Sequence, residues 1–133
     1  MAVLVDTCVY LDILAEDSRW FEWSSNALAK AADTGTIVLN PIIYAEVSAH
    51  IDRIEFLDSF FPEAIFDYQP ISKEAAFLAG KRHVEYRKRG GQKHSPLADF
   101  FIGAHAAVGR LPLVTRDVKR FSTYFPKLEL ICP

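Results

Sequence analysis

Residues 95–117 constrain the fold of this chain more than any other part of its sequence. Ser95 suits the N-cap of a helix and Pro96 its first position, and an almost wholly apolar run follows as far as Val108. A helix with so little polar surface is expected to be buried on most of its sides. Asp99 nevertheless lies near its start, so the sequence predicts a carboxylate beside a buried helix.

A short strand with a second carboxylate at its end is predicted next. Residues 111–114 are mainly apolar, and Thr115, Arg116 and Asp117 follow them. Helix starts and strand ends can adjoin at the carboxyl edge of an α/β sheet, where ligands bind. We therefore expect Asp99 and Asp117 to lie near each other.

The rest of the chain alternates between expected strands and helices. The expected strands are residues 2–5, 36–39, 64–68, 111–114 and 128–132, and the expected helices are residues 9–14, 18–33, 41–49, 52–61, 72–89, 95–108 and 118–124. This alternation predicts an α/β fold in which helices cover both faces of a mostly parallel sheet.

The length of 133 residues, half of them hydrophobic, suits a single domain over residues 1–133 with a substantial core. No apolar run reaches the roughly 18 residues of a membrane span, and the N-terminus lacks the basic start of a signal peptide. Cys8 and Cys132 form neither a metal-binding spacing nor a disulfide framework. We expect a reduced, cytoplasmic protein without membrane contact.

The net charge of −2 conceals an asymmetry between the two halves of the chain. Residues 1–70 hold twelve Asp and Glu against three Lys and Arg, whereas residues 71–133 hold five against twelve. Such a split predicts one surface that suits a polyanion and another that stays acidic. The basic segment is expected to bind substrate phosphates, with a merely solvated helix face as the alternative. Its cations are Lys81, Arg82, Arg87, Lys88, Arg89 and Lys93.

Four carboxylates lie in or beside apolar segments: Asp6, Glu46, Asp99 and Asp117. A lone acid in such a place is costly, and several acids together repel one another unless a cation is present. Mg²⁺ removes this conflict because it takes oxygen ligands and binds substrate phosphates. The chemistry that follows is hydrolysis of a phosphodiester by a metal-activated water.

Each of these carboxylates, taken alone, has a simpler explanation. Asp6 and Asp117 would serve as helix caps, and Glu46 would point outward from its helix. Asp99 is harder to explain in this way, because its helix has almost no polar face. The segment after Asp6 has no glycine, which argues against a dinucleotide-binding turn, and Cys8 stands where a haloacid-dehalogenase-like phosphatase has an Asp.

Other side chains receive weaker assignments. Asn40, where a strand meets a helix, is a further candidate for the acidic pocket, and His105 is expected to be a core residue. Aromatic residues are expected mostly in the core, with some facing a partner: Trp20, Phe21, Trp23, Phe56, Phe60 and Phe61.

Four segments together carry a resemblance to a known family. They are Val5-Asp6-Thr7, Tyr44-Ala45-Glu46-Val47, Ala98-Asp99-Phe100-Phe101-Ile102-Gly103-Ala104-His105-Ala106, and Leu113-Val114-Thr115-Arg116-Asp117 with Lys119-Arg120-Phe121. Over nearly its whole length the chain resembles the PIN-domain ribonucleases, and within them the VapC-type toxins of toxin–antitoxin pairs. The resemblance implies a three-layer α/β/α sandwich, an acidic site for Mg²⁺ or Mn²⁺, and cleavage of RNA.

The resemblance also implies roles for individual residues. Asp6 and Asp99 would bind the metal directly or through water, and Asp117 would bind the same ion through water or a second ion. Glu46 would orient the attacking water, and Thr115 would support a carboxylate.

The expected partners are an RNA substrate, a second copy in a homodimer, and a small antitoxin whose tail lies along the early helices and places an Arg or Lys among the acids. Two alternatives stay open. The chain would be a non-catalytic PIN-like module that binds RNA or a protein, or an RNA-processing PIN nuclease that is not a toxin.

Overall fold

A computed structural model describes residues 1–91 and 97–133 of the chain. The described residues form a five-stranded sheet in the order β3-β2-β1-β4-β5, with every neighbouring pair parallel. The strands are β1 (Val3–Val5), β2 (Ile37–Leu39), β3 (Phe66–Tyr68), β4 (Leu113–Val114) and β5 (Leu130–Ile131). The prediction of a mostly parallel α/β sheet is confirmed.

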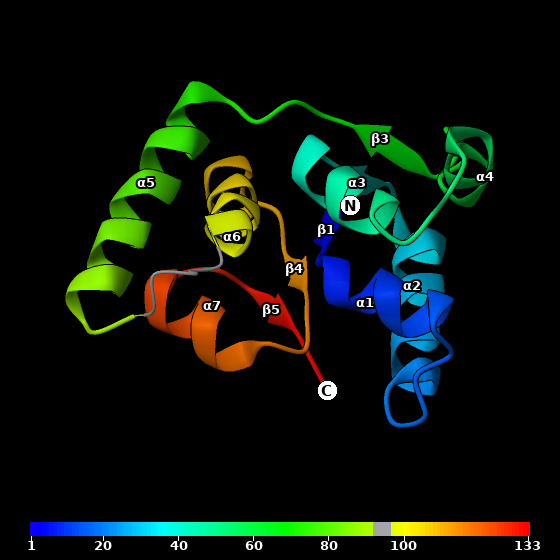
Figure 1. Cartoon of the computed structure of the whole chain (residues 1–133), viewed down its shortest axis with the longest axis horizontal. Coiled ribbons are helices and arrows are strands. Elements are labelled where there is room, and N and C mark those ends of the chain that lie inside the picture. Colours follow the sequence, from blue (N-terminus) through cyan, green and yellow to red (C-terminus); the bar gives the residue numbers. More distant parts are fainter. Residues whose placement is uncertain (92–96) are drawn as a thin grey trace.

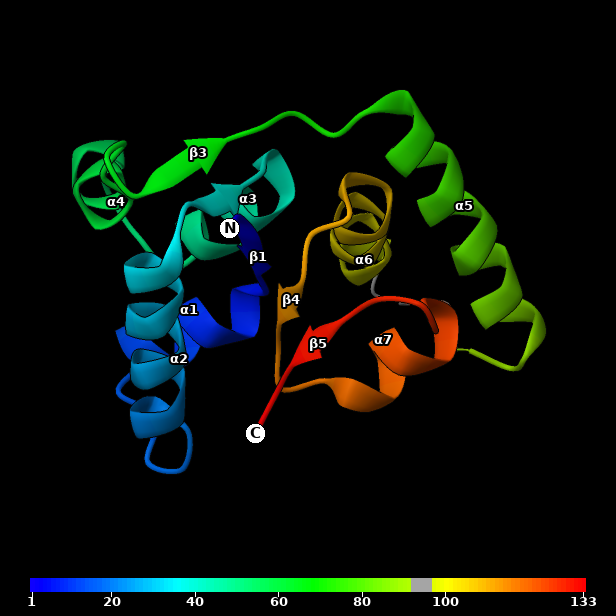
Figure 2. The same cartoon turned by 180° about the vertical axis from the view of Figure 1, so that it is seen from behind.

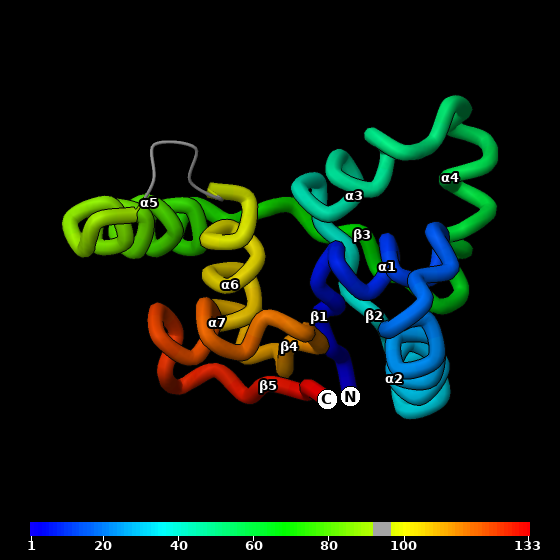
Figure 3. The backbone as a smooth tube through the Cα atoms, turned by 60° about the horizontal axis from the view of Figure 1, so that its bottom comes forward, coloured from blue at the N-terminus to red at the C-terminus, as the bar shows by residue number. Residues whose placement is uncertain are grey.

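Seven helices in the described residues cover the two faces of this sheet. They are α1 (Thr7–Leu14), α2 (Phe21–Thr34), α3 (Pro41–Ser48), α4 (Ile54–Phe60), α5 (Lys73–Lys88), α6 (Leu97–Gly109) and α7 (Val118–Tyr124). Helices α1 to α4 lie on one side and α5 to α7 on the other, as Figures 1, 2 and 3 show from three directions. Within the described residues, no helix has the length and apolar character that crossing a membrane requires.

The strand order explains why the helices divide between the two faces. From β1 the chain steps outward to β2 and β3, and it then returns to place β4 and β5 on the opposite side of β1. Because parallel crossovers are almost always right-handed, connections that run in opposite directions place their helices on opposite faces. β1 and β4 therefore lie side by side where the direction of winding reverses.

The residues in the centre of the sheet account for its position in the core. All residues of β1, β2 and β4 are buried, and all are Val, Leu or Ile. Continuous apolar strands are typical of a parallel sheet that is covered on both faces. The outer strands are less buried: Phe66 of β3 lies in the core, whereas the two residues after it are exposed.

Side-chain caps fix the starts of three helices where the sequence places cap residues. The Asn40 side chain accepts a hydrogen bond from the N–H of Ile43, and Ser72 accepts one from Ala75. Asp117 accepts one from the N–H of Arg120 at the start of α7. The expected start of α6 at residues 95 and 96 lies outside the described residues.

The second helix begins later than the expected residue 18, and a local carboxylate explains the difference. Both Arg19 and Trp20 donate their backbone N–H groups to Oδ1 of Asp17, at 2.9 and 2.8 Å. An Asp that accepts from the residues two and three positions ahead closes a turn. Residues 18–20 consequently form turns, and α2 starts at Phe21.

Helix α6 has more buried residues than any other helix in the described residues, in line with its apolar sequence. It packs along α5 (Figures 1 and 2), and six of its residues are buried. A Cβ on Gly103 would clash with the Phe125 ring, so this glycine permits the close approach of the segment after α7.

We predict that Gly103→Ala lowers the free energy of unfolding by about 1–3 kcal/mol, because the added methyl group overpacks the core against the Phe125 ring. Gly80→Ala is the matched control. Gly80 lies in α5 with open space where its Cβ would be, so this change should stabilise the protein by about 1 kcal/mol through helix propensity. Urea unfolding measures both, and equal effects would contradict the close contact at Gly103.

Candidate active site

Four carboxylates from distant parts of the chain line one pocket. Asp6 follows β1, Asp117 lies just beyond β4, Asp99 is in the first turn of α6, and Glu46 is in α3. Their side chains line a cavity of about 460 Å³, together with Thr7, Cys8, Leu11 and Arg116. The cavity lies at the carboxyl ends of β1 and β4, where the winding of the sheet reverses and α/β folds bind ligands.

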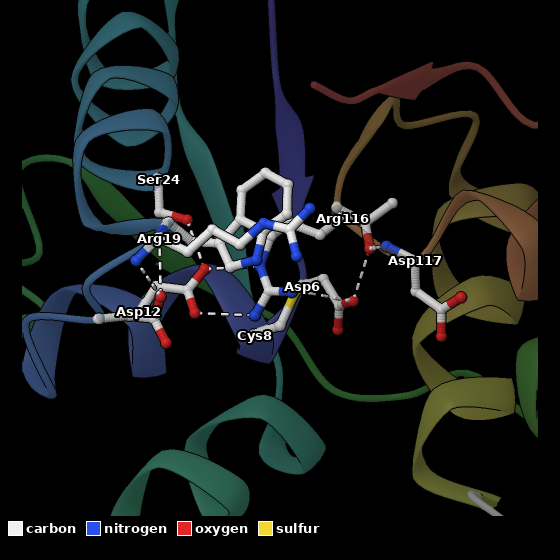
Figure 4. A network of polar contacts seen from close by, with 10 residues as sticks. Asp6, Cys8, Asp12, Arg19, Ser24, Arg116 and Asp117 are labelled. Atoms are coloured by element: carbon white, nitrogen blue, oxygen red, sulfur yellow. Dashed lines mark hydrogen bonds and ion pairs between the residues drawn. The ribbon is translucent and has the colours of Figure 1, made fainter.

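Two threonine hydroxyls and one arginine hold three of the carboxylates. Thr115 Oγ1 donates to Oδ2 of Asp6 at 2.7 Å (Figure 4), and Thr7 Oγ1 donates to Oε1 of Glu46 at 2.7 Å. Arg120 Nη1 donates to Oδ2 of Asp99 at 2.5 Å. Such contacts fix the rotamers of the acids and leave the second oxygens of Glu46 and Asp99 without a hydrogen bond to any described residue.

Thr115 also connects two of the acids. It is fully buried, and its Oγ1 accepts a hydrogen bond from the backbone N–H of Asp117 at 3.0 Å while donating to Asp6. The position of Asp117 is thereby coupled to that of Asp6, which is the supporting contact that the sequence predicts for Thr115.

Burial raises the pKa of three acids in the pocket. The pKa of Asp6 rises from 3.8 to about 6, mainly through burial; the Thr115 hydrogen bond opposes the rise and the charge of Asp99 adds to it. The pKa values of Glu46 and Asp99 also rise through burial, and the hydrogen bonds from Thr7 and Arg120 respectively oppose these shifts. Burial disfavours the charged forms of these acids, and a bound cation would stabilise them.

Cys8 lies beside Asp6 in the same pocket but is not a reactive thiolate. Its Sγ donates to Oδ2 of Asp6 at 3.4 Å. Burial, followed by the nearby charge of Asp6, raises the pKa of the thiol to about 12. A thiol that stays protonated at neutral pH is a poor nucleophile, so the chemistry of this pocket rests on its carboxylates.

The chain matches one known protein family over most of its length. The family model of the PIN domain matches residues 3–124. This chain belongs to the PIN domain family. The sequence-based resemblance is thereby confirmed at the level of the family, and a search of curated proteins gives no match.

Solved structures with the same fold include a toxin–antitoxin complex. A chain of VapBC2 from Rickettsia felis, in a crystal structure with a DNA fragment from the promoter, superposes with a TM-score of 0.71 at 22% identity, covering 100% of this chain and 99% of that one. A toxin–antitoxin complex from Klebsiella pneumoniae gives 0.69 at 23%, covering 98% and 97%. FitAcB from Neisseria gonorrhoeae gives 0.67 at 20%, covering 98% and 96%.

Two residues that support the pocket of this PIN domain were not identified from the sequence. Thr7 holds Glu46, and the signal for it was a hydroxyl residue directly after Asp6 at the start of a helix. Arg120 holds Asp99 and lies 3.8 Å from Oδ2 of Asp117, and its guanidinium also stands over the Tyr86 ring. Its contact with Asp99 depends on how α7 packs beside α6, which no local pattern encodes.

The prediction that Asn40 reaches the pocket is wrong. Asn40 is fully buried, its Oδ1 caps α3, and its Nδ2 lies 2.9 Å from Nδ1 of His105. Both polar atoms of its side chain are therefore engaged in the core. The expectation that His105 is a core residue is confirmed: it is buried, and burial lowers the pKa of its imidazole.

The basic segment starts in the second half of α5, and this helix packs along the helix that carries Asp99. Some of its cations are already engaged: Arg82 forms an ion pair with Glu85 at 2.7 Å, and Arg89 stands over the Tyr124 ring. Arg87 and Lys88 are exposed in the last turn. Lys81 is exposed over the Phe77 ring, and Lys93 lies outside the described residues.

The carboxylate oxygens of the pocket are ligands of the kind that a hard divalent ion prefers, but several of them already accept hydrogen bonds from other side chains. Among residues 1–91 and 97–133, no three His, Cys, Asp or Glu side chains are placed to hold a metal ion together. One oxygen each of Asp6, Glu46 and Asp99 is engaged by Thr115, Thr7 and Arg120. Carboxylate oxygens with raised pKa values are nevertheless ligands that suit Mg²⁺ and Mn²⁺. Metal binding by Asp6, Asp99 and Asp117 stays a prediction.

We predict that wild-type stability in EDTA falls as pH rises from about 4 to about 6. The pKa of folded Asp6, about 6, lies above its ordinary 3.8, so the folded state binds more protons in this window. Stability is then present at low pH and lost as Asp6 ionises, by at most about 3 kcal/mol. Asp6→Asn should flatten this decline and exceed the wild type in stability at pH 7.

Urea unfolding between pH 4 and pH 7 measures these curves. Asp52→Asn is the control, because Asp52 is an exposed loop acid and its replacement should leave the decline as steep as in the wild type. Parallel curves for the wild type and Asp6→Asn would show that Asp6 is not the acid with the raised pKa.

Proposed function

We propose that this PIN domain, acting as a single nuclease domain over residues 1–133, is a metal-dependent endoribonuclease that hydrolyses RNA phosphodiester bonds. PIN domains are typically nucleases and use divalent metals. The observation that carries the proposal is the convergence of Asp6, Glu46, Asp99 and Asp117 on one pocket, with raised pKa values for three of them.

The contacts of each side chain suggest its role in the proposed reaction. Asp6 and Asp99 would hold the Mg²⁺ or Mn²⁺ ion, and Asp117 would share it or hold a second one. An ion held there would supply Lewis-acid chemistry, which would polarise a phosphoryl oxygen and lower the pKa of a bound water. Glu46 orients the attacking water with the oxygen that Thr7 leaves free, and its raised pKa makes it a better proton acceptor. Thr115 and Arg120 hold Asp6 and Asp99 in place.

We propose further that this nuclease is the toxin of a toxin–antitoxin pair and forms a homodimer. The support is the VapC-like sequence together with the full-length likeness to chains of toxin–antitoxin complexes. An RNA-processing role would be favoured instead if no inhibitory partner exists. A dimer has twice the chain mass of 15.0 kDa in light scattering, and a monomeric mass would remove that part of the proposal.

The antitoxin tail is proposed to dock in an apolar groove of about 490 Å³ beside α2 and α4. Ile13, Leu28 and Phe60 line it, and the acidic first half of the chain would attract a cationic tail. Phe61 is one of the aromatic residues considered for this contact, but it does not face the partner, because it is buried and packs on Phe66 in the core.

We predict that Ala29→Arg weakens inhibition by the proposed antitoxin without changing nuclease activity. Ala29 is exposed and lines the groove, so an arginine there fills it and repels a cationic tail. Asn26→Arg, an exposed position on α2 outside the groove, is the control. Inhibition assays at matched concentrations compare the two, and equal inhibition of both would place the tail elsewhere.

We predict that Asp99→Asn abolishes RNA cleavage and that excess EDTA does the same to the wild type. The amide keeps the shape of the side chain but removes a charged oxygen that the metal requires. Mn²⁺ should also raise the melting temperature of the wild type, because binding to the folded state stabilises it, and should raise that of the variant less. Full activity in the variant or in EDTA would exclude the metal-dependent mechanism.

We predict that the basic segment binds backbone phosphates of RNA. Replacing Arg87, Lys88 and Arg89 with Gln should weaken binding and lower the log–log dependence on salt by about 0.7 for each phosphate that the variant no longer neutralises. Lys73→Gln at the other end of α5 is the control, and it should change neither quantity. If the triple variant keeps the wild-type slope, the segment is only a solvated helix face.

A further inference from the structure

Arg116 stands at the edge of the acidic pocket with its guanidinium fixed from two sides. Its Nε donates to Oδ2 of Asp12 at 2.7 Å and its Nη2 donates to Oδ1 of Asp12 at 2.8 Å (Figure 4). Its guanidinium carbon also lies 5.0 Å from the centre of the Trp20 ring. A bidentate pair and an aromatic surface together leave the planar group little freedom.

Asp12 is an anchor for Arg116 rather than a fifth acid of the pocket. Only 4% of its side chain is exposed, its Oδ2 also accepts from Ser24 Oγ at 2.7 Å, and it does not line the cavity. Its charge offsets that of Arg116. The pair therefore leaves the negative charge of the four pocket acids in place.

The edge of the guanidinium that Asp12 does not use is available to a ligand. Arginine has five N–H donors, and Asp12 takes the one on Nε and one on Nη2. The remaining N–H groups of Nη1 and Nη2 make no hydrogen bond within residues 1–91 and 97–133. An edge of two parallel N–H groups matches two oxygens of a phosphate.

Arg116 is the one cation that lines the pocket among the described residues. Arg120, which touches Asp99, is not part of the lining and holds that acid from outside the cavity. Arg116 also lies between Thr115 and Asp117 in sequence, so a group bound to it is brought next to the carboxylates.

We infer that Arg116 binds a backbone phosphate of the RNA through its Nη1–Nη2 edge, and that Asp12, Ser24 and Trp20 are its positioning residues. This inference rests on the proposed nuclease function. Because the side chain is already immobilised, binding a phosphate costs little additional side-chain entropy. The role differs from that of Arg87 and Lys88, which are exposed in the last turn of α5.

The first test is Arg116→Gln, with a fluorescein-labelled single-stranded 12-nucleotide RNA of mixed sequence as the probe. Binding is measured by anisotropy in the cleavage-deficient Asp99→Asn background, and kcat and KM are measured with Mn²⁺ in the otherwise wild-type chain. Removing a charged bidentate interaction should weaken binding about tenfold and raise KM more than it lowers kcat. The salt slope should fall by about 0.7.

Arg116→Gln alone leaves the buried Asp12 charge without its partner, which destabilises the fold. The double variant Asp12→Asn/Arg116→Gln removes both charges and allows the two amides to pair. It should fold more stably than Arg116→Gln and yet bind RNA as weakly. Wild-type affinity and salt slope in the double variant would overturn the inference, because Arg116 would then have a structural role alone.

Asp12→Asn alone tests whether Asp12 positions Arg116, independently of the contact between Arg116 and the phosphate. It keeps the charge of Arg116 but weakens its fixation, so we expect a wild-type salt slope with a raised KM. An unchanged KM would overturn the positioning role of Asp12. Arg19→Gln is the control for the aromatic surface, since Arg19 stands over the same Trp20 ring but does not line the pocket. It should leave KM and slope unchanged.

These experiments distinguish a failure of the Arg116 inference from a failure of the proposed nuclease function. If the wild type does not cleave RNA with Mn²⁺, or if it cleaves RNA equally well in excess EDTA, the nuclease proposal fails before Arg116 is tested. If the wild type cleaves and the double variant equals it in KM, the nuclease proposal stands and the role of Arg116 is wrong.

Discussion

The parallel pairing of β1 with β4 is the contact on which the acidic pocket depends. It joins Leu4 to Leu113 and Val5 to Val114, and the N–H of Asp6 continues the ladder to the carbonyl oxygen of Val114. One residue beyond the end of β4, the Thr115 hydroxyl donates a hydrogen bond to Asp6, which is 109 positions away in the sequence. Loop closure over such a separation has an entropic cost, which burial of apolar strands on both faces offsets.

The pocket illustrates a compromise between stability and binding. Burial of Asp6, Glu46 and Asp99 works against their ionisation, and an apolar replacement would relieve that cost. The protein limits the cost with hydroxyl and guanidinium donors that satisfy one oxygen of each acid and leave the other oxygens of Glu46 and Asp99 unpaired within the described residues. Partial satisfaction of this kind keeps the acids fixed in position while preserving their attraction for a cation.

The sequence predicted the alternating elements, the buried helix and the acids that now line one pocket, because strand ends and helix starts are local patterns. It did not predict the supporting contacts. Thr7 and Arg120 act on residues from other elements, so their roles appear only when α1 lies against α3 and α7 lies near α6. Asn40 was assigned to the pocket because it follows a strand. Its Oδ1 instead caps α3 and its Nδ2 contacts His105, so both polar atoms are engaged elsewhere.

The two cysteines differ in a way that has practical value. Cys132 is exposed near the end of the chain, whereas Cys8 is partly buried beside Asp6 and its thiol stays protonated at neutral pH. Reagents that attack thiolates discriminate between such sites. A maleimide dye or spin label should therefore attach to Cys132 in preference to Cys8, which provides a single reporter position on this chain without mutagenesis and without blocking the acidic pocket.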